Sequence, residues 1–248
     1  MKTLLTTGAL VASLCTPALA TPSINIGGMH EFMGGDTSTF VKRVYNNGDS
    51  TAFVRVSVSE IVIDAQGNAT EKPIDATGVM NKQAQGVVAS PARLIVPAGG
   101  MQAGRLLYMG PRDKERIYRV RYIPVVPTDK SEFGQSDAEF NDYKNKTNAQ
   151  VTMLTGYGAL LAVRPESERY DTLIRDVGDK HSVRNNGNTT IILERFRECQ
   201  PGLKKCSPSA VRYIAPGKES IFTAKAGHSY RYELIEGKQT KTMSFGQK

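Results

Sequence analysis

VYNNGDST at residues 44–51 and VRNNGNTT at residues 183–190 are two versions of one pattern. Each is followed by a run rich in β-branched residues, AFVRVSV after the first and IILE after the second. Asn-Gly between β-rich segments is a hairpin-type signal, because both residues tolerate a positive φ. The pattern therefore predicts strands on both sides of two related turns.

A second pair of similar segments follows the first pair in the same order. IVPAG at residues 95–99 comes before RLLY, and IAPG at residues 214–217 comes before SIF. The spacing between the two signals is shorter in the second half, so the second copy is a trimmed version of the first. The repeat predicts two domains of one kind, an N-terminal domain over residues 21–165 and a smaller C-terminal domain over residues 166–248.

Other strands are predicted from alternation of apolar and polar residues with a period of two. The alternating segments are residues 53–63, 116–125, 151–163 and 230–234. Helical periodicity is weak throughout. Short strands separated by Gly, Pro and Asn are typical of antiparallel sandwiches, so we expect an all-β protein with two immunoglobulin-like β-sandwich domains.

A polar tract interrupts this pattern between residues 127 and 148. It contains five acidic and three basic residues. The tract is too long for a simple hairpin loop, so we expect it to be mobile or functional.

The first twenty residues have the features of a secretory signal peptide. Lys2 gives a positive start, residues 4–15 are largely apolar, and ALA at residues 18–20 is a small-x-small cleavage site. We expect cleavage after Ala20, and export of the remaining chain.

Two other interpretations of the N-terminus fit less well. A buried first helix is one, but the chain has no acidic residue before Glu31, which favours a signal peptide. Acylation of Cys15 after cleavage is the other, and it needs a small residue in front of the cysteine, where this chain has Leu14.

Export would leave two cysteines, Cys199 and Cys206, in an oxidising compartment. The loop between them, QPGLKK, contains a Pro-Gly turn that can bring their Cα atoms to disulfide distance. We therefore predict a disulfide. A redox-active or metal-binding pair would favour closer spacing and histidine neighbours, whereas His181 and His228 are remote in sequence.

The charge of the chain excludes little but favours acidic partners. The 248 residues include 32 Lys and Arg against 24 Asp and Glu, a formal net charge of +8. The basic residues are scattered, with no run of five, so the sequence does not predict nucleic-acid binding. Beyond the N-terminus, no segment reaches the roughly 18–20 apolar residues that span a bilayer, so we expect no membrane insertion.

Signatures of catalysis are sparse. His30, His181 and His228 form no HExxH or HxH motif, and the chain has no GxSxG elbow. Each histidine is expected to be a surface or partly buried residue rather than a metal ligand. The sequence therefore predicts neither an enzyme nor a cofactor, although a fold could still assemble a catalytic set from distant residues.

Several features together resemble the periplasmic pilus-assembly chaperones, and most of all the common-pilus (Ecp-type) branch of the alternate chaperone–usher systems. They are the signal peptide, the two immunoglobulin-like halves, GPRDKERIYRV at residues 110–120, and a long strand that ends in RP at residues 164–165. The resemblance extends over nearly the whole mature chain, including FM at residues 32–33, VPAG at residues 96–99 and the cysteine pair.

The resemblance implies a boomerang of two sandwiches that holds an incomplete pilus subunit. Such a chaperone donates its own strand to the sheet of the subunit. An outer-membrane usher then takes the subunit over. The implied partners are thus pilins and an usher.

The resemblance also implies a position for the donated strand. Counted back from residues 164–165, the segment that inserts into the pilin falls on Val151, Met153 and Thr155. These residues share one face of a strand with Tyr157, although Thr155 is less apolar than the pattern requires. The alternative is that this face packs on the protein's own core, and from Tyr157 onward we prefer that interpretation.

The resemblance does not extend to the usual carboxylate anchor. Better-known pilus chaperones hold the terminal carboxylate of the pilin with an Arg in the first strand and a Lys in the donated strand, because a buried carboxylate needs a cationic partner. Here residues 21–41 contain no Arg or Lys, and the lysine position is Leu160. We take Arg43 and Arg119 as candidate anchors, because each lies in the middle of a predicted strand among apolar residues, followed by Arg121. Solvated arginines on a strand face are the alternative.

Two other functions compete with a chaperone. A pilus subunit or adhesin would have an incomplete sandwich and a longer alternating segment just after the cleavage site, where only Ile24 and Ile26 alternate. An exported enzyme would need a clustered set of acid, base or nucleophile residues. The sequence favours the chaperone.

Overall fold

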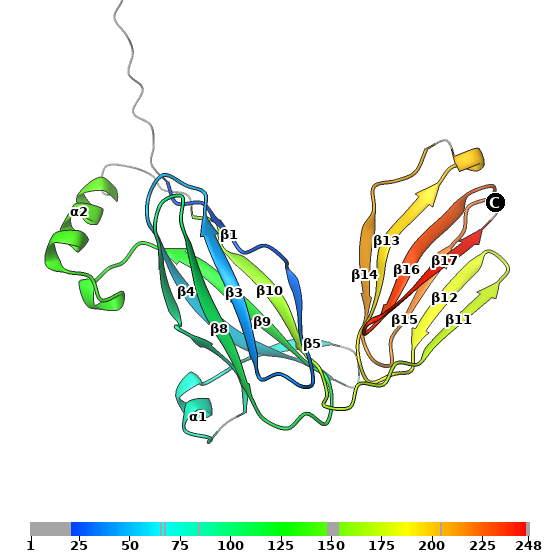
Figure 1. The fold of residues 1–248 in the computed structure, drawn as a ribbon, viewed down its shortest axis with the longest axis horizontal. Coiled ribbons are helices and arrows are strands. Elements are labelled where there is room, and N and C mark those ends of the chain that lie inside the picture. The colour runs from blue at the N-terminus through cyan, green and yellow to red at the C-terminus, as the bar shows by residue number, and fades with distance from the viewer. Residues whose placement is uncertain are drawn as a thin grey trace, which may run out of the picture.

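The computed structural model describes residues 21–64, 66, 68–83, 85–147, 154–203 and 205–246. They form two β-sandwiches that meet at one end and diverge, so that the molecule is bent (Figure 1). The chain reaches the second sandwich directly after β10, by way of residues 164–171. The predicted all-β fold is confirmed.

Two sheets build the first sandwich. One sheet has the order β1-β3-β8-β6 and consists of β1 (Ile24–Asn25), β3 (Thr39–Asn46), β8 (Met101–Met109) and β6 (Gly86–Ser90). The other has the order β2-β10-β9-β4-β5, with β7 also paired to β4, and consists of β2 (His30–Met33), β10 (Tyr157–Val163), β9 (Arg116–Val125), β4 (Ala52–Ile63), β5 (Ala69–Pro73) and β7 (Arg93–Val96).

Two further sheets build the second sandwich. One has the order β11-β12-β15, with β11 (Thr172–Val177), β12 (Lys180–Asn185) and β15 (Glu219–Thr223). The other has the order β14-β13-β16-β17, with β14 (Ala210–Ile214), β13 (Ile191–Cys199), β16 (Ser229–Glu236) and β17 (Gln239–Gly246). A short helical turn, η2 (Pro201–Leu203), follows β13.

Alternation along the strands explains the two separate cores. In β9, Tyr118, Val120 and Tyr122 are at most 2% exposed and point between the sheets, whereas the residues between them face outward. The second core includes Val183 and Ile191, both fully buried. Because each sandwich buries its own apolar residues, each is a domain-like unit.

The repeated asparagine pattern has the same structural role in both sandwiches. Asn46 ends β3, is 1% exposed, and donates from Nδ2 to the carbonyls of Ser50 (2.7 Å) and Val96 (3.0 Å). Asn185 ends β12, is fully buried, and donates to the carbonyls of Thr189 and Ile214, both at 2.9 Å. Each side chain therefore links its own turn to the last residue of another strand, β7 for Asn46 and β14 for Asn185.

The glycine of this pattern acts differently from the sequence prediction. Gly48 and Gly187 do not have positive φ, and the turns are not hairpins, because each passes from one sheet of its sandwich to the other. A Cβ on Gly48 would lie 2.1 Å from the carbonyl oxygen of Thr21, and one on Gly187 would lie 2.4 Å from that of Arg169. Glycine is needed for the close approach of two backbone segments.

Two helical segments occupy the polar tract that we expected to be mobile or functional. They are η1 (Lys130–Glu132) and α2 (Asp137–Thr147), and α2 projects from one end of the first sandwich (Figure 1). Phe53 anchors them, because the rings of Phe133 and Tyr143 lie 5.1 and 4.8 Å from its ring in edge-on geometry. Few apolar residues mark α2 in the sequence, which explains why helical periodicity did not reveal it. A further short helix, α1 (Ala76–Met80), packs against β6.

Strand β10 begins later than predicted. Alternation predicted a strand over residues 151–163, whereas the described strand starts at Tyr157, and Leu154 to Gly156 are not in a strand. Val151 and Met153 lie outside the described residues. Thr155 is described and is exposed.

Cys199 and Cys206 form a disulfide. Gln200 donates its N–H to the carbonyl of Lys205 at 2.9 Å, and Ser207 donates to that of Glu198 at 2.8 Å. The bond thus closes a short loop that continues the end of β13.

We expect replacement of both Cys199 and Cys206 with serine to lower the free energy of unfolding by about 2–3 kcal/mol, because the disulfide restricts the unfolded chain. The loss is modest because the closed loop is short and restricts few unfolded conformations. Urea unfolding of the wild type and the double variant would measure the difference. Mass spectrometry of the protein purified without reductant should find no free thiol. Two free thiols there would contradict the assignment.

Candidate functional site

Strand β10 lies between two neighbours of different direction. It pairs antiparallel with β9 along its whole length and parallel with β2 only from Leu160 to Val163. On the side of β10 that faces β2, the first hydrogen bond along the strand runs from the N–H of Leu160 to the carbonyl of Met29, at 2.8 Å. Within the described part of the chain, no strand pairs with this edge at residues 157–159. The start of β10 is therefore an open edge that can accept a further strand.

The outward face of this sheet is directed toward the second sandwich. Leu160 of β10 is paired with Arg119 of β9 on one side and with His30 of β2 on the other, so these three side chains lie on one face of the sheet. Arg121 of β9 is paired with Gly158 and lies on the same face. We call this surface the bend face; it consists of His30, Phe32, Leu160, Arg119, Arg121, Ser57, Ser59 and Glu71.

Arg119 and Arg121 bind one carboxylate on the bend face. Arg121 Nη2 lies 2.6 Å from Oε2 of Glu71, and Arg119 Nε lies 3.0 Å from Oε1 of the same side chain. Ser57 and Ser59 of β4 lie opposite the two arginines and leave room for the glutamate to reach across the strand. Arg119, a predicted anchor, and Arg121, the third candidate, therefore form a carboxylate-binding pair.

Arg43, the other predicted anchor, lies on the opposite side of the sandwich. It is exposed on the outer face of β3, beside Ala103 of β8. Because the two sheets pack by their inner faces, Arg43 and Arg119 point away from each other and cannot hold one carboxylate together. The neighbouring Lys42 is buried, and its Nζ bonds to the carbonyl of Gly28 and to Glu31 Oε1, both at 2.5 Å.

Aromatic contacts connect the bend face to the second sandwich. The rings of His30 and Tyr213 stack with centroids 4.2 Å apart and planes 16° apart. Phe32 lies 6.0 Å from the same tyrosine, and the guanidinium of Arg164 lies over Phe32 at 4.7 Å. The bend face is thus bounded at one end by Tyr213 of β14.

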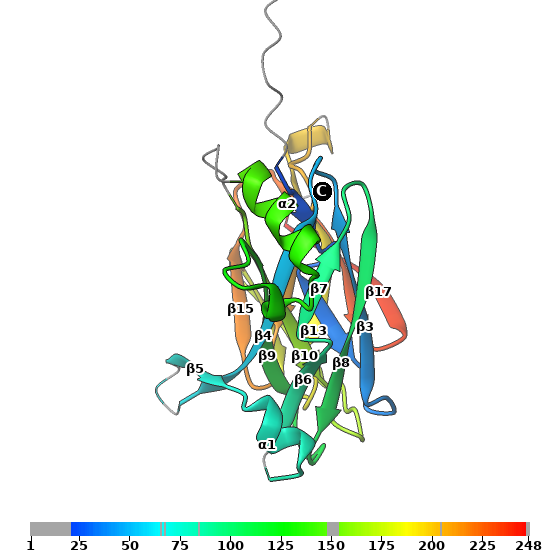
Figure 2. The same ribbon diagram turned by 90° about the vertical axis from the view of Figure 1, so that its left-hand side faces the viewer.

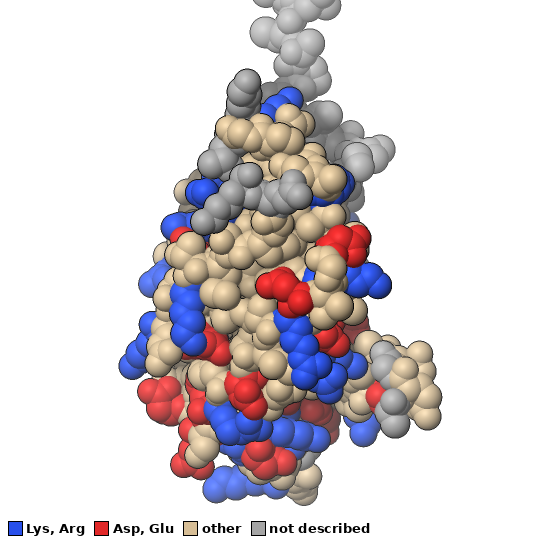
Figure 3. Space-filling model, turned by 90° about the vertical axis from the view of Figure 1, so that its right-hand side faces the viewer, with Lys and Arg blue, Asp and Glu red and all other residues tan. Residues whose placement is uncertain are grey.

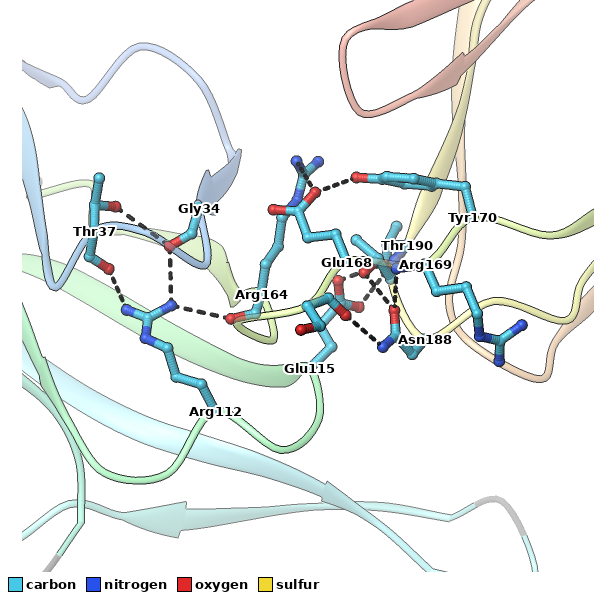
Figure 4. A network of polar contacts seen from close by, with 12 residues as sticks. Gly34, Thr37, Arg112, Glu115, Arg164, Glu168, Arg169, Tyr170, Asn188 and Thr190 are labelled. Atoms are coloured by element: carbon cyan, nitrogen blue, oxygen red, sulfur yellow. Dashed lines mark hydrogen bonds and ion pairs between the residues drawn. The ribbon is translucent and has the colours of Figure 1, made fainter.

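The junction of the two sandwiches is held by polar groups from the GPRDKE segment (Figure 4). Arg112 Nη1 donates to the carbonyls of Gly34 (2.9 Å) and Arg164 (3.0 Å), and Nη2 donates to that of Thr37. Its guanidinium also lies 4.9 Å from the ring centre of Tyr108. Arg112 therefore ties the loop after β2 to the residue at which the chain leaves β10.

Glu115 makes a polar contact between the two sandwiches. Its carboxylate accepts hydrogen bonds from the backbone N–H of Thr190, at 2.9 Å, and from the Thr190 hydroxyl. Burial raises the pKa of Glu115 above its usual value, and the two bonds from Thr190 act in the opposite direction. Beside it, Tyr170 donates to Glu168 at 2.5 Å, and Arg164 lies 3.4 Å from the same carboxylate.

The sequence did not point to Arg112, Glu115 or Glu71 individually. Arg112 and Glu115 belong to a segment that carried the family resemblance, but nothing in that segment showed which groups they contact. Glu71 follows no motif, because its role depends on the pairing of β4 with both β5 and β9.

A further polar cluster lies in the second sandwich, around His181. His181 is 2% exposed, and its ring nitrogens lie 2.6 Å from Asp176 Oδ1 and 2.9 Å from the hydroxyl of Tyr232. Among the described residues there is no group of His, Cys, Asp or Glu that could hold a metal ion, and no helix long and apolar enough to cross a membrane. Acidic and basic side chains are interspersed on the side of the molecule shown in Figure 3.

Comparison with known sequences supports this architecture. No protein-family model matches the chain. The probable fimbrial chaperone EcpB of Escherichia coli (strain ATCC 8739) is 28% identical over 221 residues, which cover 87% of this chain and 86% of EcpB. The predicted resemblance to fimbrial chaperones is confirmed.

Solved structures show the same fold at low sequence identity. The class 5 fimbriae chaperone CfaA gives a TM-score of 0.52 at 18% identity, over 91% of this chain and 100% of CfaA. A complex of the Salmonella enterica SafA pilin with the SafB chaperone gives 0.51 at 14% identity, over 94% of this chain and 99% of the matched chain. The fold of two immunoglobulin-like sandwiches is therefore shared with chaperones of fimbrial assembly.

Proposed function

We propose that this chain is a periplasmic chaperone that binds, folds and protects fimbrial subunits by donor-strand complementation, and then delivers them to an outer-membrane usher. The similarity to EcpB and the fold shared with CfaA support this proposal. Residues 1–20 act as a signal peptide that is removed after Ala20. Residues 21–165 form the subunit-binding domain, and residues 166–248 form the second domain. The protein is not an enzyme.

The open edge at the start of β10 is the observation that carries the proposal. A subunit that lacks a strand exposes a groove between two of its own strands, and an added strand satisfies the backbone groups there. Among the described residues, no strand pairs with residues 157–159 on the edge that faces away from β9, and the chain before them leads back to Thr155, Met153 and Val151. These three residues supply the alternate side chains that fill the groove.

Arg119 and Arg121 bind the terminal carboxylate of the subunit. They lie on the bend face, on the strand next to β10, and the structure already places a carboxylate between them. Two guanidinium groups suit a carboxylate because each can donate charge-assisted hydrogen bonds. Arg43 lies too far around the sandwich to join them.

Changing Arg119 and Arg121 together to alanine should abolish subunit capture, because a buried carboxylate without its cationic partners costs about 2–5 kcal/mol. The fold should be retained, since each arginine side chain is more than a third exposed and its ion pair is weak. The measurement is the amount of fimbrial subunit that co-purifies when the chain is co-expressed with the products of its neighbouring genes.

Arg43→Ala is the matched control for this experiment, as it removes an exposed arginine from a strand of the same domain. It should leave capture unchanged. Loss of capture by Arg43→Ala, with normal capture by the double variant, would place the anchor on the other sheet. A wild-type chain that recovers no subunit would argue against the chaperone function itself.

A further inference from the structure

The geometry points to Glu71 as an internal stand-in for the subunit. We propose that its carboxylate occupies the Arg119–Arg121 site in the free chain, and that a carboxylate of the subunit displaces it on binding. This inference rests on the proposed function. In this state of the free chain, both arginines are paired with Glu71, and they exchange its carboxylate for that of the subunit when a subunit binds.

The contacts show a carboxylate bound as a ligand would be. Each oxygen of Glu71 faces a different arginine, at 2.6 Å from Arg121 and 3.0 Å from Arg119. The two arginines carry two positive charges against the single negative charge of Glu71. Buried Nε of Arg119 makes no hydrogen bond within the described part of the chain, so its contact with Glu71 is electrostatic and poorly directed. A better-placed acceptor would improve on it.

The position of Glu71 allows it to leave. It lies on β5, whose five residues are all exposed and which projects from the side of the sandwich (Figure 2). The side chain of Glu71 is 32% exposed, and those of Arg119 and Arg121 are 39% and 36% exposed. Ion pairs with this much solvent access are weak, so displacement needs no change in the core.

The register explains why this glutamate reaches the site. Glu71 is paired with Ile61 of β4, and Arg119 is paired with Ser59 of the same strand. The carboxylate therefore reaches diagonally across β4, over a serine that offers little obstruction. Either neighbour of Glu71 along β5 would face away from the arginines, because successive side chains alternate between the two faces.

The stand-in can be tested with acetate as a carboxylate probe. We would follow the Nε–H signals of Arg119 and Arg121 by NMR in the full mature chain during titration with acetate, with chloride at equal ionic strength as reference. The variant Glu71→Gln keeps the shape of the side chain and removes its charge. It should reach half of its maximal shift at about three- to fivefold lower acetate concentration than the wild type, the factor expected for loss of an exposed ion pair.

Two controls define the site. Glu60→Gln removes a carboxylate that lies 3.3 Å from a different arginine, Arg116, and should leave the acetate midpoint unchanged. In the double variant with Glu71→Gln and Arg119→Ala, the NMR signal of Arg121 should no longer shift with acetate, or its midpoint should lie above the highest acetate concentration used. Equal midpoints for the wild type and Glu71→Gln would overturn the stand-in role, as would a response that survives loss of Arg119.

A second arm separates this inference from the proposed function. Subunit complexes of Glu71→Gln should dissociate more slowly than wild-type complexes on dilution, because the competing carboxylate is absent. Equal acetate midpoints with normal subunit capture would remove the stand-in and leave the chaperone function intact. An acetate response without any subunit capture would remove the chaperone function and leave a carboxylate site of another use.

Discussion

Replacing Val151 and Met153 with aspartate should abolish capture of fimbrial subunits while leaving the melting temperature of the free chain nearly unchanged. Each apolar side chain buried in a subunit groove contributes roughly 1.5–3 kcal/mol, and a buried unpaired carboxylate is strongly unfavourable. In the sequence these residues precede the start of β10, where one edge has no strand partner among the described residues. The measurements are thermal unfolding of the variant alone and subunit recovery from co-expressing cells.

A matched control exists on the other sheet. Val41 and Met101 are also a valine and a methionine in the same domain, 47% and 46% exposed on the outer face of β3 and β8. Their double change to aspartate should leave capture intact. If the Val151 and Met153 variant unfolds, these residues belong to the protein's own core; if it folds and still protects the subunit, the inserted segment lies elsewhere.

Replacing Asn185 with alanine should lower the free energy of unfolding of the second sandwich by about 3–5 kcal/mol, since each buried group left without a partner costs about 1–3 kcal/mol. The change leaves the carbonyls of Thr189 and Ile214 and the N–H of Gly187 without their partner. Urea unfolding followed by circular dichroism would measure it. Asn46→Ala should act similarly on the first sandwich.

The adjacent asparagine provides the comparison. Asn186 is exposed, and its side chain accepts a solvent-exposed hydrogen bond from Arg184 at 3.1 Å. Asn186→Ala should change stability by less than about 0.5 kcal/mol. Similar losses for Asn185→Ala and Asn186→Ala would show that the buried network does not stabilise the turn.

The sequence was sufficient to predict the two sandwiches because strands and turns leave local signals. Residues 116–125 were predicted as a strand and form β9 with the same limits. The repeated Asn-Gly pattern correctly predicted two related turns, but hairpin turns with positive φ were expected, and the turns have neither feature. Positive φ is instead required at Gly99 and Gly217, with φ of 63° and 74°, which follow the second signal of each repeat.

The site was less predictable because its parts come from different strands. Arg119 was proposed from its place among apolar residues, whereas its partner Glu71 depends on the register of β4 with two neighbours. Arg43 has a similar sequence context and lies on the opposite face. Local alternation gives the side of a strand that a residue occupies, but not which sheet that strand joins.

The parallel pairing of β2 with β10 has a consequence for the order of folding. His30 near the start of the first sandwich is paired with Leu160 near its end. Contacts this remote along the chain carry a high loop-closure entropy and form late. The first sandwich therefore cannot close before its C-terminal strand has been synthesised, and the open edge at the start of β10 forms only when the domain is complete.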